Sequence, residues 1–173
     1  MRSVRWAATA AAVLLGVNSS IAGAQATCTG NPCTVQVTAS ATVNDVLRLT
    51  LSSATANLGT PAEADYDAGF LDAAGPTASV KSNRPWHVDV AGAAAVFSYA
   101  GSLTNPNKPA SQLLWGTTAG TYGNDMGSSA VLANGATGTG NASQAIFFRT
   151  MWSWATDVPG SYGLVINFTL AAP

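Results

Sequence analysis

The stretch that decides the fold is Thr34-Val35-Gln36-Val37-Thr38-Ala39-Ser40-Ala41-Thr42-Val43, ten residues in which polar and apolar side chains alternate without a break. Successive side chains of a β-strand point to opposite faces, so this alternation is typical of a strand with one apolar face. The apolar face carries Val35, Val37, Ala39, Ala41 and Val43. The pattern predicts a strand at this position, and much of the remaining sequence repeats it.

The same alternation recurs outside this stretch. It places Leu47, Leu49 and Leu51 on one face of residues 46–52; Trp86, Val88 and Val90 on one face of residues 86–90; and Tyr162, Leu164, Ile166, Phe168 and Leu170 on one face of residues 162–170. Further strand candidates are residues 78–81, 95–99, 112–115, 130–133 and 144–154, and no segment shows a convincing helical period. The pattern predicts an all-β chain, a single antiparallel Ig-like β-sandwich of about eight or nine strands.

Turn signals separate the predicted strands. Asn44-Asp45 has turn chemistry, residues 62–76 and 116–141 are predicted to form mainly loops, and Pro159-Gly160 precedes the final strand. Tyr162 begins that strand two residues after the turn. We therefore expect its hydroxyl group to bond to the backbone of the turn, as in tyrosine corners.

The N-terminus has the features of a cleaved export signal. Arg2 and Arg5 precede an apolar run over residues 6–17, and small residues permit cleavage after Ala24 or Ala26. The sequence therefore predicts a signal peptide over residues 1–26 and one domain over residues 27–173. The expected location is secreted, at the cell surface or in the periplasm of a bacterium.

Charge and hydropathy exclude several classes of protein. Without Arg2 and Arg5, five basic residues stand against eight acidic ones, a formal charge near −3, so a nucleic-acid partner is not expected. Beyond the signal, no apolar run is long enough for a transmembrane segment.

Catalysis is not expected either. No Gly-x-Ser-x-Gly elbow is present, Glu63 is the one Glu, and His87 and Asp89 share an outward strand face. Surface decoration explains such a pair without chemistry. We therefore predict that the chain is not an enzyme.

Cys28 and Cys33 are the two cysteines, separated by Thr-Gly-Asn-Pro. Export to an oxidising compartment favours a disulfide between them, and Gly30, Asn31 and Pro32 supply the tight turn that so short a loop needs.

Four acidic residues lie within ten positions: Glu63, Asp65, Asp67 and Asp72. Alternate carboxylates around a turn are compatible with a calcium loop, because calcium takes six to eight oxygen ligands. The EF-hand pattern is not met, since Ala68 stands where that loop needs Gly. A solvated acidic loop is the competing interpretation; no other cofactor is expected.

The tryptophans also allow two interpretations. Trp115, Trp152 and Trp154 could form a platform on which sugar rings stack, whereas large aromatic side chains also fill sandwich cores. Trp86 already lies on an apolar face.

Three motifs resemble a known group of proteins. They are Ser82-Asn83-Arg84-Pro85-Trp86-His87-Val88; Trp154-x-x-Asp157-x-Pro159-Gly160-x-Tyr162; and Asn167-Phe168-Thr169-Leu170. These look like secreted bacterial β-sandwich surface proteins, namely WxL-type domains and, more loosely, spore-coat-U and pilin-like sandwiches. The chain departs from the WxL pattern, because neither Trp86 nor Trp115 is followed two residues later by Leu. It also lacks the bridging cysteines and aromatic C-terminus of chaperone–usher pilins.

The expected function is that of an exported, non-catalytic structural or adhesive surface subunit. Residues 34–43 either form an ordinary first strand of their own sheet, or leave it and add as a donor strand to a second copy, which would build filaments. The alternative function is a carbohydrate- or cell-wall-binding module that uses exposed Trp.

Overall fold

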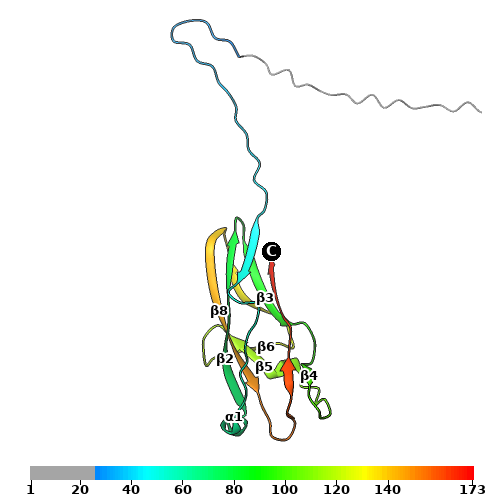
Figure 1. Ribbon diagram of the computed structural model, residues 1–173. Coiled ribbons are helices and arrows are strands. Elements are labelled where there is room, and N and C mark those ends of the chain that lie inside the picture. Colours follow the sequence, from blue (N-terminus) through cyan, green and yellow to red (C-terminus); the bar gives the residue numbers. More distant parts are fainter. Residues whose placement is uncertain (1–25) are drawn as a thin grey trace, which may run out of the picture. The chain divides into compact units, whose positions relative to one another are not determined.

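The computed structural model describes residues 26–173, so the predicted signal peptide lies, except for its last residue, outside the described residues. The chain divides into two units, Met1–Thr42 and Val43–Pro173. The described residues of the first unit carry no regular element. All the helices and strands of the described chain lie in the second unit (Figure 1).

Two antiparallel sheets make up most of the second unit. In the first sheet the strands follow the order β1 (Leu47–Leu51), β2 (Phe70–Ser82), β8 (Thr139–Met151), β5 (Leu113–Gly116), β6 (Asn124–Asp125). In the second, the order is β10 (Ile166–Ala171), β3 (Trp86–Gly92), β7 (Ala130–Gly135). A ribbon of β4 (Ser98–Ala100) and β9 (Ser161–Gly163) completes the strands; the helices are α1 (Glu63–Ala68) and the short 3₁₀ helix η1 (Ala110–Gln112).

The core lies between the two sheets, where the inward side chains of both meet. Val88 and Val90 of β3 and Ile146 and Phe148 of β8 have no exposed surface, and Trp86 is 3% exposed. The intervening residues of β3 are half-exposed, as the alternation predicts. The predicted all-β class is confirmed, and the packed sheets form an antiparallel β-sandwich.

The predicted loop over residues 62–76 is wrong. Glu63–Ala68 forms α1, and β2 begins at Phe70 and pairs with β8. A register shift between Ala74 and Thr77 accommodates Pro76, because a bulge tolerates a residue that cannot donate a backbone hydrogen bond. Pro76 therefore interrupts the ladder without ending the strand.

The prediction that Thr34–Val43 forms a strand of its own sheet is also wrong: the first strand is β1, and residues 34–42 belong to no strand. The cause lies where the chain enters β1. The Asn83 side chain accepts a hydrogen bond from Val46 N at 2.9 Å and donates one to Asn44 O at 2.7 Å, while Arg84 forms an ion pair with Asp45. These bonds lead residues 44–46 directly into β1 rather than into a hairpin turn.

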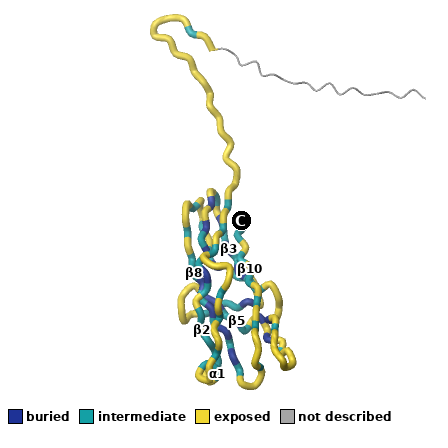
Figure 2. The backbone as a smooth tube through the Cα atoms, viewed as in Figure 1, coloured by how far each residue is buried: buried dark blue, intermediate teal, exposed yellow. Residues whose placement is uncertain are grey.

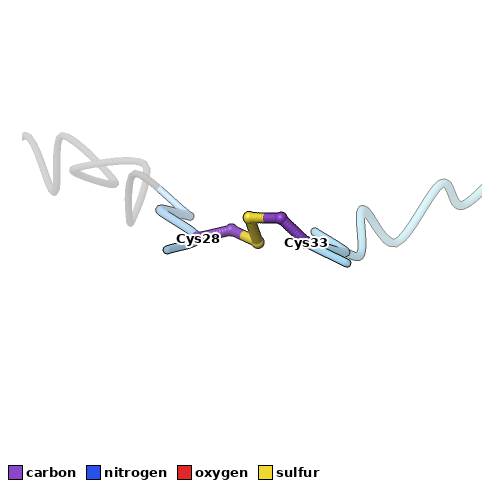
Figure 3. The surroundings of a disulfide bond; sticks show 2 residues. All are labelled: Cys28 and Cys33. Atoms are coloured by element: carbon purple, nitrogen blue, oxygen red, sulfur yellow. A yellow bond between two sulfur atoms is a disulfide. The ribbon is translucent and has the colours of Figure 1, made fainter. Parts of the chain in front are cut away.

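Within residues 26–173, no helix is long and apolar enough to cross a membrane. Cys28 and Cys33 form a disulfide, as predicted, with their Cα atoms 5.8 Å apart (Figure 3).

Candidate interaction site

The segment of residues 34–43 keeps its strand-like pattern without a strand partner in the described chain. Its apolar side chains are exposed, with Val37 at 86%, Val43 at 82% and Val35 at 46%, and Ala39 and Ala41 are exposed too (Figure 2). Contiguous exposed apolar side chains usually mark an interaction site. This segment is therefore the first of two candidate interaction surfaces.

The second candidate surface is a strip of the sandwich where no strand pairing joins the two sheets. β1 is an edge of the first sheet and β10 an edge of the second, and a pocket has lining residues from both strands. Half-buried residues alternate with exposed ones along residues 47–51 and 166–170. We call this strip the seam; it is lined by Leu47, Leu49 and Leu51 of β1 and by Ile166, Phe168 and Leu170 of β10.

The seam opens into the core at the Leu51 end. A cavity of about 470 Å³ lies there, and its lining includes Leu51, Leu58, Leu164 and Phe168. Phe148, which is fully buried between the sheets, also lines it. An apolar side chain placed in this cavity would bury its surface against core side chains, which is favourable.

Side-chain bonds define one end of the seam. At this end, Arg84 pairs with Asp45, just before β1, and also donates a hydrogen bond to the C-terminal Pro173 O at 3.3 Å. The start of β1 and the end of β10 therefore lie at the same end of the sandwich. Leu51 and the residues that precede β10 lie at the other end.

The tyrosine corner predicted at Tyr162 is confirmed. Its hydroxyl group donates to Val158 O at 2.7 Å and accepts a hydrogen bond from Val158 N at 3.0 Å. Burial raises the pKa of Tyr162, and the bond with the Val158 backbone opposes this shift. The corner fixes where the chain enters the final extended segment, whose predicted inward face from Tyr162 to Leu170 is also confirmed.

Sequence reasoning missed a buried ion pair beside this corner. Lys108 and Asp157 have side chains 1% and 2% exposed, with the Lys108 Nζ 2.9 Å from Asp157 Oδ1. The ammonium group also donates to Gln112 Oε1 at 2.9 Å and to Met151 O, so its three protons have acceptors. Burial lowers the pKa of Lys108, and the bonds to Asp157 oppose that effect. No local pattern could have paired residues 49 positions apart.

The four acids proposed as calcium ligands do not converge. Asp65 accepts a hydrogen bond from Ala62 N at 2.7 Å, and Asp67 accepts one from Trp154 Nε1 at 3.0 Å. Asp72 forms a two-bond ion pair with Arg149, which lowers the pKa of the Asp72 carboxyl group. Among the described residues, no group of three or more His, Cys, Asp or Glu side chains is arranged to hold a metal.

Of the two interpretations of the tryptophans, core packing holds for two of the three, because Trp115 and Trp152 belong to the interior. Trp115 has no exposed surface and Trp152 is 9% exposed, whereas Trp154 is 63% exposed. Trp154 stacks on Tyr66 with ring centroids 4.6 Å apart. Of the three tryptophans considered for a sugar platform, Trp154 is the one that is largely exposed, and Tyr66 covers one face of its ring.

No protein-family model matches this chain, and neither the curated proteins nor the solved structures compared with it contain a match.

Proposed function

We propose that this chain is an exported, non-catalytic structural subunit of a bacterial surface that self-associates by strand addition, with residues 34–43 as the donated strand. The observation that carries the proposal is a ten-residue alternating segment that is exposed and unpaired in the described chain. Strand addition would satisfy its backbone groups with main-chain hydrogen bonds and bury its alternate side chains in pockets.

Export is supported by two further observations. The N-terminal sequence has the pattern of a signal peptide. The Cys28–Cys33 disulfide is the kind of bond that forms and persists in oxidising compartments. A donor strand just after this disulfide remains free to reach a second copy.

The test is the size of the assemblies formed by the mature protein and by two neighbouring Lys variants. We expect the wild-type protein to sediment as large, denaturant-resistant oligomers. Ala39→Lys places a charge on the apolar face of the segment and should leave monomers, because an unpaired charge is costly to bury. Ser40→Lys, the matched control, places it on the polar face and should assemble. A wild-type protein that stays monomeric at high concentration, with no fibres on cells, contradicts the proposal.

A second function, a carbohydrate- or cell-wall-binding module, is favoured by Trp154. Its exposed ring is held by the stacking on Tyr66 and by the bond to Asp67, and aromatic faces of this kind stack on sugars. This function predicts that the protein is retained on peptidoglycan or insoluble glycans. Trp154→Ala should abolish retention, whereas Trp154→Phe, which keeps an aromatic face, should retain most of it.

A further inference from the structure

The sandwich lacks a strand at the seam. β10 pairs with β3 through one edge, and its other edge has no strand partner in the described part of the chain. Its inward side chains pack against the core and yet remain partly exposed. An unpaired edge of this kind is a template for pairing with another chain. A strand added there would also cover the inward side chains of β1.

We propose that the seam is the acceptor site for residues 35–43 of a second copy, bound antiparallel to β10 and to residues 162–165, which continue from β9 into β10; this inference rests on the proposed function. In the register that matches five apolar residues with five, Val35 lies opposite Leu170 and Ala39 opposite Ile166. Val43 then lies opposite Tyr162, and the intervening pairs are Val37 with Phe168 and Ala41 with Leu164.

The pattern and length of the two segments agree. Residues 162 to 170 alternate between half-buried and exposed at every position, and residues 35 to 43 alternate between apolar and polar. Each spans nine residues, about 27 Å at a rise of about 3.3 Å per residue. The donor's small Ala side chains fall opposite Ile166 and Leu164, and Val43 reaches the region of the cavity that Tyr162 helps to line.

An antiparallel direction keeps the sheet that receives the strand uniformly antiparallel, which is the commoner arrangement. β10 and β7 both run antiparallel to β3. An antiparallel donor starts at the end where Arg84 holds the C-terminus and finishes near Tyr162 and Leu51. The body of the donor subunit then continues from the Leu51 end.

With the antiparallel direction, residues 35–43 have to enter the seam of another copy rather than their own. Within one chain, Val43 is four residues from Leu47, a reach of at most about 14 Å, while the nine residues from Tyr162 to Leu170 span about 27 Å. Residues 44 and 46 are bound to Asn83 at the opposite end from Tyr162. A chain therefore cannot place its own Val43 beside its own Tyr162. The donor strand therefore comes from another copy, and a head-to-tail series of such contacts that does not close into a ring builds an open filament.

A mixing experiment tests the acceptor site. Ile166→Lys damages the seam and leaves the donor intact, whereas Ala39→Lys damages the donor and leaves the seam intact. Each variant alone should lose assembly by about tenfold or more, because Lys brings a charge into an apolar contact. Their equimolar mixture should form a one-to-one dimer and nothing longer. Asn167→Lys, on the exposed face of β10, is the matched control and should assemble normally.

The outcomes separate this inference from the proposed function. If Ala39→Lys prevents assembly and a folded Ile166→Lys variant still forms filaments, residues 34–43 are the donor strand but the seam is not the site that accepts it. If the wild-type protein never assembles, the proposed function itself fails. If Ile166→Lys does not fold, cross-linking between pairs of introduced cysteines, which are smaller and uncharged, tests whether the seam accepts the donor strand.

Those cysteine pairs also test the direction. Val35→Cys with Leu170→Cys should give reducible cross-links between copies during assembly, and Val43→Cys with Leu170→Cys should not. Cross-linking of the second pair alone would show a parallel donor and overturn the proposed register. A cross-link between Val37→Cys and Leu164→Cys within a monomer would show that the segment fills its own seam, which would overturn both the direction and the exchange.

Discussion

Replacing Lys108 by Met should be among the most damaging single changes outside the apolar core. The substitution keeps an unbranched side chain of similar length and removes the ammonium group. Asp157, whose side chain is 2% exposed, then keeps one backbone donor, Ser153 N at 2.9 Å, and loses its counter-charge. The Met151 O and Gln112 Oε1 acceptors lose their donor as well.

The magnitude follows from the burial of both partners. Removal of one partner from a buried ion pair costs about 3–5 kcal/mol, because the remaining charge is desolvated and unpaired. A domain of this size has a total free energy of unfolding of about 5–15 kcal/mol. At a urea dependence of about 1–3 kcal/mol per molar, the unfolding midpoint should fall by about 2 M.

Urea unfolding of the mature protein, followed by tryptophan fluorescence, measures this loss. Lys81→Met is the control: Lys81 is exposed on β2, and its loss should change stability by no more than about 0.5 kcal/mol. The double variant Lys108→Met with Asp157→Leu should recover part of the loss, since apolar replacements of buried pairs are often neutral. A cost below about 1 kcal/mol for Lys108→Met would refute the buried pair.

Two further predictions concern the tyrosines. Tyr162→Phe should lower the free energy of unfolding by about 1–3 kcal/mol, because two hydrogen bonds to Val158 are lost. Thermal denaturation measures this loss, with Tyr99→Phe, which loses one exposed hydrogen bond, as the control. Equal losses of stability in the two variants would contradict the prediction. Burial raises the pKa values of Tyr66, Tyr122 and Tyr162. Their contribution to stability should be fully present below about pH 10 and lost as the pH rises through the raised values. Absorbance titration should show these phenols ionising later in the folded than in the urea-unfolded protein, and coincident curves would contradict the prediction.

Several features were predictable because they depend on short-range sequence. Alternation assigns side chains to the two faces of a strand wherever that strand packs, so the buried face of Trp86–Val90 and the inward face from Tyr162 to Leu170 were predicted correctly. The tyrosine corner was predictable because Tyr162 bonds to a residue only four positions away. The Cys28–Cys33 pair was equally local.

Alternation by itself determined that this chain is built from antiparallel strands, but it does not identify the partner of a strand. Thr34–Val43 has the clearest strand pattern, and yet tertiary structure left residues 34–42 unpaired. Asn83 and Arg84 bind residues 44–46, which follow this segment, and hold them in line with β1. Packing between distant segments likewise buried Trp115, exposed Trp154 and enclosed Lys108 with Asp157. These outcomes depend on which surfaces meet across the sandwich, and that is a non-local property of the folded chain.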